Sequence, residues 1–169
     1  MPFRVIDVDV EELEAGPPQE VARENALRKA RAGADLARDE AVLGVDTLVA
    51  LDGRIWGKPA DEAAARTTLE ALSGRTHDVV SGLAVVGDGE PATAIEVTRV
   101  TFHALDATLV DWYLASGEWR GRAGGYAIQG RGGVLVQRLE GDYLNVVGLP
   151  VGRLAELCGG FAAFLADRT

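Results

Sequence analysis

The chain has 169 residues, a formal net charge of −9 and 47% hydrophobic residues. This balance is typical of a soluble globular domain with a hydrophobic core, and the acidic charge argues against binding of nucleic acid polymers. No apolar run approaches the ~20 residues that cross a membrane, and the start lacks the features of a signal peptide. The single Cys158 excludes a disulfide framework and suits the reducing cytoplasm.

Hydrophobic periodicity and the residues that begin and end elements predict a mixture of helices and strands. The predicted strands cover residues 3–10, 41–51, 54–56, 78–86, 94–105, 134–139 and 143–147. The predicted helices cover residues 18–38, 61–72, 107–115 and 150–164, and the last contains Cys158, which we expect to be a buried thiol. These elements predict an α/β or α+β fold with a mixed sheet.

Nearly all basic residues are arginines. Of the 17 lysines and arginines, only Lys29 and Lys58 are lysines. The two residue types are interchangeable on a solvated surface, but not where a compact charge meets a phosphate or other ionisable groups. The two lysines are therefore candidates for a functional site, with chance retention on an exposed surface as the alternative.

Asp46 interrupts the apolar run over residues 41–51. Burial of a carboxylate is costly unless it is paired, hydrated or bound to a cation. One interpretation is a carboxylate at the mouth of a cleft that binds metal or activates water, and the other is a hydrogen-bonding residue at a strand end. His77 and His103 lack the spacing of metal ligands, and we interpret them as structural.

Two further segments have features of ligand contacts. Gly57-Lys58-Pro59 places a lysine on a rigid strand end, where little entropy is lost when it meets a phosphate. The glycine-rich segment 124–133 matches neither a Walker A loop nor a dinucleotide-binding loop. We expect its glycines to allow positive φ angles around Gln129, whose amide suits the edge of a base. The alternative for Lys58 is a lysine in an ordinary turn, and the alternative for residues 124–133 is a loop that binds no ligand.

Five motifs occur in the order and spacing of one family: Gly44-Val45-Asp46-Thr47, Asp52-Gly53 followed by Gly57-Lys58-Pro59, Leu72-Ser73-Gly74-Arg75-Thr76-His77, the segment Ala123–Gly130, and the segment Glu140–Pro150. Through them the chain resembles the Maf family of nucleoside triphosphate pyrophosphatases from Phe3 to the C-terminal helix. The resemblance implies a single Maf-like domain over residues 1–169. It implies an elongated mixed sheet with flanking helices and two lobes around a cleft, similar to inosine triphosphate pyrophosphatases.

The resemblance also implies an activity and its residues. The activity is hydrolysis of a nucleoside triphosphate to the monophosphate and pyrophosphate with a divalent metal, Mg²⁺ or Mn²⁺. Asp46 matches the family's catalytic acid, taken as a general base. Lys29 and Lys58 match two lysines that balance phosphate charge. Glu12 matches an acidic residue that joins Asp46 in holding the metal.

Thr47 and Gln129 match positions that distinguish the branch acting on dTTP and UTP from the branch acting on 7-methyl-GTP. Family members begin with a strand and a Ser-x-Ser-Pro-Arg-Arg loop, and this chain starts after that point. We therefore expect a truncation of ~20 residues, an exposed sheet edge near Asp46 and a possible homodimer. The alternatives to an active enzyme are a binding or regulatory protein without turnover and, more weakly, a cell-division interaction module.

Overall fold

The computed structural model describes residues 3–37, 40–87 and 89–160. Its helices are α1 (Pro18–Leu36), α2 (Glu62–Leu72), α3 (Ala107–Ala115), α4 (Tyr143–Val147) and α5 (Val151–Leu157), with the 3-10 turns η1 (Ala123–Gly125) and η2 (Arg131–Leu135). Its strands are β1 (Val42–Leu51), β2 (Arg54–Trp56), β3 (Thr76–Val86), β4 (Ala92–Phe102) and β5 (Val136–Glu140). They form one sheet in the order β2-β1-β3-β4-β5.

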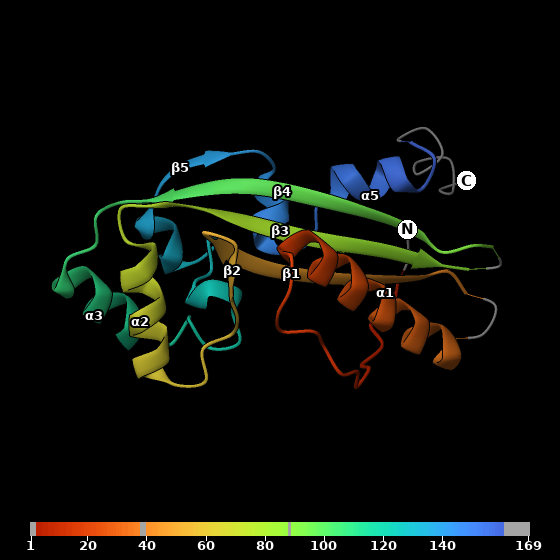
Figure 1. Cartoon of the computed structure of the whole chain (residues 1–169), viewed down its shortest axis with the longest axis horizontal. Coiled ribbons are helices and arrows are strands. Elements are labelled where there is room, and N and C mark those ends of the chain that lie inside the picture. The colour runs from red at the N-terminus through yellow and green to blue at the C-terminus, as the bar shows by residue number, and fades with distance from the viewer. Residues whose placement is uncertain (1–2, 38–39, 88, 161–169) are drawn as a thin grey trace.

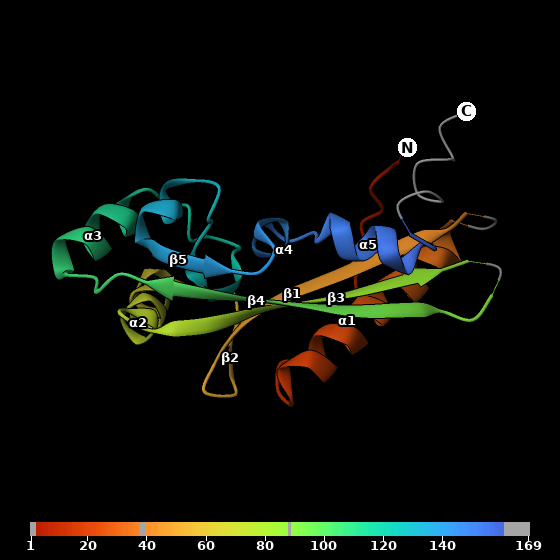
Figure 2. The same ribbon diagram turned by 90° about the horizontal axis from the view of Figure 1, so that it is seen from above.

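The sheet is long and twisted, and helices flank it at both ends (Figure 1). Helices α2 and α3 lie at one end, and α1 lies toward the other. Figure 2 shows α1 on one face of the sheet and α4 and α5 on the opposite face. The predicted α/β fold with an elongated sheet and flanking helices is confirmed. Each strand pair within the described residues is antiparallel, so the sheet is antiparallel there and not mixed as predicted.

Helix α1 lies directly on β1 and β3 because small residues line both surfaces. Ala22, Ala26 and Ala30 of α1 are fully buried. A Cβ atom on Gly44 of β1 would overlap the backbone carbonyl of Ala26, and one on Gly82 of β3 would overlap that of Ala22. This close approach fixes the position of α1 on the sheet, and with it every side chain that α1 presents.

The larger hydrophobic core lies at the other end of the sheet, under α2, α3 and the loop that follows α3. The buried residues that fill it include Val49, Leu51, Leu69, Leu72, Val79, Val100, Phe102, Val110, Tyr113, Tyr126 and Leu135. Both helices begin as the sequence predicts. The Asp61 carboxylate accepts a hydrogen bond from the amide of Ala64, and the Asp106 carboxylate accepts one from the amide of Leu109.

Strand β1 has an open edge beside Asp46. On one side, β1 pairs with β3 from Val42 to Ala50. On the other side, β2 pairs only with Val49–Leu51. In the part of the chain that the structure describes, no strand pairs with residues 42–48 on that second side. The expected open edge near Asp46 is present, whereas a homodimer stays a prediction.

The strand predicted over residues 3–10 is wrong. This segment has no regular secondary structure, and Phe3 and Val5 are 86% and 80% exposed. Alternation of apolar residues stabilises a strand only when a neighbouring strand supplies hydrogen bonds and one face is buried. No such pairing occurs here among the described residues.

Two predictions near the C-terminus are also wrong. Residues 143–147 were expected to form a strand but form α4, because the Asp142 carboxylate caps the first turn by accepting from the amide of Leu144. Cys158 is exposed rather than buried, because α5 ends at Leu157 and two glycines with positive φ follow. Residues 161–164 of the predicted final helix lie outside the described residues. Within those residues, no helix is long and apolar enough to cross a membrane.

His77 of β3 is buried in the larger core. Its ring packs edge-on against Phe102, with ring centroids 4.9 Å apart, and against Tyr126, with centroids 5.6 Å apart. Burial lowers the pKa of His77 from 6.5 to about 4. The ring is therefore neutral at physiological pH, in keeping with the structural role that its sequence context indicates.

We expect Gly44→Ala to lower the free energy of unfolding by about 2 kcal/mol or more, because only a shift of α1 relieves the overlap with a backbone carbonyl. Urea titration measures this change. The matched control is Gly152→Ala in α5, where a Cβ atom would have no neighbour within 4 Å. That variant is expected to keep or gain stability. Equal urea midpoints for the two variants would contradict close packing of α1.

We expect the free energy of unfolding to decrease as the pH is lowered, partly because of His77. Its pKa is lower in the folded state than in the unfolded chain, so the unfolded state takes up the proton first. Above pH 6.5 the neutral His77 ring contributes fully to the free energy of unfolding. This contribution is lost as the pH falls from 6.5 to about 4, and the loss amounts to roughly 3 kcal/mol. Urea unfolding across this pH range should show that the free energy of unfolding declines less steeply in His77→Gln than in the parent protein. The control is the exposed His103, and His103→Gln should keep the parental slope.

Candidate active site

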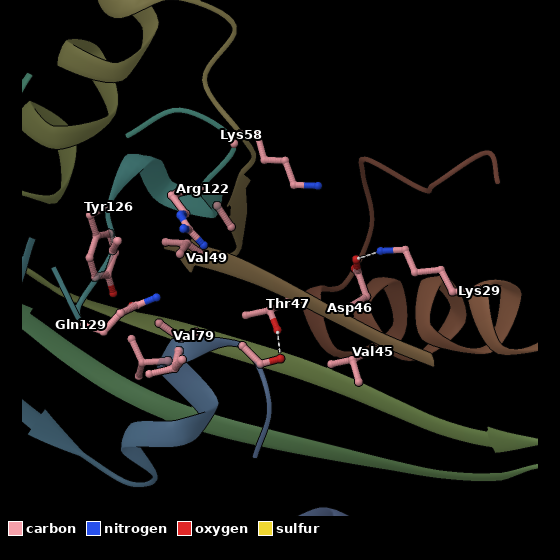
Figure 3. Close-up of a pocket in the computed structure, with 16 residues that line it drawn as sticks. Lys29, Val45, Asp46, Thr47, Val49, Lys58, Val79, Arg122, Tyr126 and Gln129 are labelled. Carbon is pink, nitrogen blue, oxygen red and sulfur yellow. Dashed lines mark hydrogen bonds and ion pairs between the residues drawn. The ribbon is translucent and has the colours of Figure 1, made fainter. Parts of the chain in front are cut away.

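A pocket with a volume of about 260 Å³ lies beside the open edge of β1. It is formed by α1, β1, Lys58, the loop around η1 and the end of α4 (Figure 3). Its lining includes Lys29, Asp46, Thr47, Val49, Lys58, Val79, Arg122, Tyr126, Gln129, Val146 and Gly148. Because β2 stops pairing at Val49, side chains from both faces of β1 reach this one pocket.

A lysine and two carboxylates meet at one end of the pocket. The Nζ atom of Lys29 lies 2.6 Å from Oδ1 of Asp46 and 2.8 Å from Oε1 of Glu12. Partial burial by itself lowers the pKa of Lys29, but the hydrogen bonds and charges of the two carboxylates outweigh burial and raise that pKa. The hydrogen bond from Lys29 in turn lowers the pKa of Glu12. Lys29 and Glu12 are therefore both charged at neutral pH, and at this end a single ammonium group faces two carboxyl groups.

Asn25 holds this cluster together and was not identified from the sequence. Its amide Nδ2 donates to Oδ2 of Asp46 at 3.2 Å and to the carbonyl oxygen of Leu13 at 3.0 Å. Its Oδ1 accepts from the amide of Leu13 at 2.7 Å. The side chain is buried and lies one helical turn before Lys29. Two features of the sequence could have revealed Asn25. It is a polar residue in the apolar stripe of α1, and it is four residues before Lys29, so both side chains lie on the same face of the helix.

Two further cationic side chains, Lys58 and Arg122, line the pocket. Lys58 is anchored through its neighbour, because the amide of Gly124 donates to the carbonyl of Gly57 at 3.1 Å. Arg122 lies on the loop before Gly124 and was also not identified from the sequence (Figure 3). Neither forms an ion pair with any residue that the structure describes. Both are therefore available to an anionic ligand.

The far end of the pocket is mostly apolar with a few polar groups. In Figure 3, Tyr126, Gln129 and Val79 lie at this end, and Thr47 lies between them and Asp46. The Thr47 hydroxyl lies 2.7 Å from the hydroxyl of Ser81. The Gln129 side chain makes no hydrogen bond within the described part of the chain and is exposed to the pocket.

The predicted positive φ angles occur at the start of the glycine-rich segment and not beside Gln129, because the neighbouring Gly130 has a φ angle of −111°. Gly124 and Gly125 have φ angles of 66° and 69°. A Cβ atom on Gly124 would also press against the side chain of Val49. Glycine is therefore required at Gly124 both for its conformation and for its close approach to β1.

The carboxylates fit a divalent metal that also binds substrate. Glu12 and Asp46 both converge on Lys29 Nζ, so their oxygens are close together. Among the described residues, no group of three or more histidine, cysteine or acidic side chains is placed to hold a metal ion. Mg²⁺ is commonly held by one or two carboxylates, with phosphate and water oxygens as the other ligands. This donor set matches such a site and does not match an all-protein metal cage.

The structure brings the sequence-predicted site residues together. Lys29, Asp46, Thr47, Lys58 and Gln129 all line the pocket, although they come from α1, β1 and two loops. Glu12 reaches the same place through its ion pair with Lys29. Their chemical roles stay predictions.

Comparison with known proteins identifies the family. The family described as Maf-like protein matches residues 1–161. The chain belongs to the Maf family. The resemblance inferred from the motifs is therefore confirmed, and it extends over nearly the whole sequence.

Curated members of the family include similar proteins from several Bacillus strains. A protein named dTTP/UTP pyrophosphatase from Bacillus cereus (strain AH187) is 44% identical over 156 residues, which cover 91% of this chain and 82% of that protein. Proteins of the same name from Bacillus mycoides (strain KBAB4) and Bacillus thuringiensis subsp. konkukian (strain 97-27) are 43% and 44% identical with the same coverage.

We expect Asn25→Ala to release the segment that carries Glu12, because it removes both hydrogen bonds to Leu13 and the one to Asp46. Hydrogen exchange at the Leu13 amide should accelerate by about tenfold or more, while the amides of α1 stay protected. The control is Arg31→Ala, an exposed position on the same helix. Unchanged exchange at Leu13 in Asn25→Ala would contradict this role.

Proposed function

We propose that this Maf protein hydrolyses a pyrimidine nucleoside triphosphate, dTTP or UTP, to the monophosphate and pyrophosphate. The observation that carries the proposal is the division of one pocket into two ends. One end has a carboxylate–lysine cluster with two free cations nearby, and the other has an apolar wall with amide and hydroxyl groups. The first suits a triphosphate and the second a base. The name shared by the Bacillus relatives supports the same substrates.

In this proposal the phosphates lie against Lys58 and Arg122. Phosphate transfer depends mainly on positioning and on neutralising negative charge, which two unpaired cations supply. Asp46 accepts a proton from the attacking water, whose oxygen bonds to the α-phosphorus. The bond from the α-phosphorus to the α,β-bridging oxygen breaks, and pyrophosphate leaves. Lys29 and Asn25 orient Asp46 through their hydrogen bonds to its two carboxyl oxygens.

Glu12 and Asp46 are the residues that would hold Mg²⁺ or Mn²⁺ together with phosphate oxygens. When bound, such an ion lowers the pKa of a water ligand and offsets phosphate charge. The structure supports this assignment because two carboxyl groups meet at one point with only a single ammonium group between them. Thr47 and Gln129 are proposed to select the base, because both face the pocket between the cluster and its far end.

We expect Asp46→Asn to lower kcat for pyrophosphate release from dTTP and UTP by about 100-fold or more, because the amide cannot accept the proton. The assay uses Mg²⁺ or Mn²⁺, with EDTA abolishing turnover, and circular dichroism checks the fold. The matched control is Asp52→Asn, an exposed aspartate in the turn that follows the same strand. Full turnover by Asp46→Asn would contradict the mechanism, and nucleotide binding without turnover by the parent chain would favour the binding-protein alternative.

A further inference from the structure

A backbone carbonyl group lies at the wall of the pocket beside Thr47. Gly148, the residue that follows α4, lines the pocket and is partly buried. Its carbonyl oxygen lies 3.5 Å from the hydroxyl oxygen of Thr47, which also lines the pocket, and Figure 3 draws this contact as a dashed line. A hydroxyl at this distance makes at most a weak hydrogen bond. The carbonyl oxygen therefore keeps its capacity to accept a stronger hydrogen bond from a ligand.

The turn after α4 does not use this oxygen. The amide of Gly148 donates to the carbonyls of Leu144 and Asn145 at 3.1 and 3.0 Å, and the amide of Leu149 donates to the carbonyl of Leu144 at 3.0 Å. Among the described residues, no backbone amide donates to the carbonyl of Gly148 itself. Backbone carbonyls require a hydrogen-bond donor from the protein, from water or from a ligand. This one therefore suits an N–H group of a molecule bound in the pocket.

A buried network attaches α4 to the sheet and fixes the position of this carbonyl. The Thr98 hydroxyl of β4 accepts from the amide of Asp142 and from Nδ2 of Asn145, both at 3.0 Å, and donates to the carbonyl of Asp142 at 3.1 Å. Nδ2 of Asn145 also donates to the carbonyl of Val79 in β3 at 3.0 Å. Thr98 and Asn145 are fully buried. Helix α4 is thus held at its N-cap and at its middle, so the carbonyl that follows it has a defined place in the pocket wall.

We propose that the Gly148 carbonyl is a specificity-determining group that accepts a hydrogen bond from the N3–H group of uracil or thymine. A carbonyl oxygen can only accept, so it distinguishes a ring nitrogen that carries hydrogen from one that carries a lone pair. N3 of cytosine carries a lone pair, which would face the lone pairs of the carbonyl, so the same pose is unfavourable for CTP. Thr98 and Asn145 are positioning residues for this contact. The inference rests on the proposed function, because it assigns a base contact in the same pocket.

N3-methyl-UTP tests the contact in the unmutated protein, because methylation removes the N3–H group. We expect kcat/KM for pyrophosphate release to fall about tenfold or more relative to UTP, mainly through KM. The control for added bulk is 5-methyl-UTP, whose methyl group lies on a different edge of the ring and which should react like UTP. Equal kcat/KM for N3-methyl-UTP and UTP would overturn the proposal while leaving the pyrophosphatase intact. Absence of pyrophosphate release from both UTP and dTTP by the parent chain would instead overturn the proposed function.

The carbonyl chemical shift reports on the acceptor itself. The chain contains two Gly-Leu pairs, Gly82-Leu83 and Gly148-Leu149, so protein with ¹³C-carbonyl glycine and ¹⁵N-leucine gives two cross-peaks in an HNCO spectrum. Saturation with α,β-methylene-UTP, which cannot release pyrophosphate, should move the Gly148 carbonyl resonance downfield. Gly82 of β3 is the internal control and should not move. The N3-methyl form of the same analogue should not produce the downfield shift. A Gly148 resonance that stays in place at saturation with α,β-methylene-UTP would overturn the proposal.

Thr98→Val tests whether the attachment of α4 positions the carbonyl. The variant loses three hydrogen bonds, so KM for UTP should rise about fivefold with kcat changed less than about twofold, and the loss caused by N3 methylation should become smaller. Thr98→Ser retains the hydroxyl and should retain the parental KM and the parental loss. The matched control is Thr68→Val in α2, whose hydroxyl donates to the carbonyl of Ala64 in its own helix. A parental loss on N3 methylation in Thr98→Val would overturn the positioning role.

Discussion

The close contact between α1 and the sheet is the constraint on which the rest of the structure depends. Gly44 and Gly82 let the helix backbone approach β1 and β3 to a distance that any side chain would prevent. At that distance Asn25 and Lys29 reach Asp46 directly, and Asn25 also holds the chain beside Glu12. A wider separation would leave a buried carboxylate without partners, which is costly.

The charges in the pocket are arranged in two groups with different roles. Lys29 is already paired with Glu12 and Asp46, so its main effect is to hold these two carboxyl groups together at one point. Lys58 and Arg122 have no such partners within the described chain and face the same space. A protein with a net charge of −9 can in this way attract an anionic nucleotide. The positive charge is local and acts on a ligand at contact distance, where screening by salt is weak.

Local sequence signals predicted most elements but not those that depend on a partner. The helix predicted over residues 107–115 is correct, because its capping residue Asp106 acts within a few residues of the first turn. Residues 3–10 alternate like a strand yet have no strand partner in the described structure. Residues 143–147 suit either element, and the cap at Asp142 decided for a helix.

By itself, the sequence determined the α/β class through its periodic patterns and the family through its motifs. It also identified Asp46, Lys29 and Lys58 as candidate site residues, because each is unusual in type within its own segment. Tertiary structure decided the rest. Asn25, Arg122 and the carbonyl of Gly148 join the pocket or support it only because distant segments meet there. The open edge of β1 likewise depends on where β2 stops pairing. Contacts between residues far apart in the chain leave no periodic pattern, so only the folded arrangement reveals them.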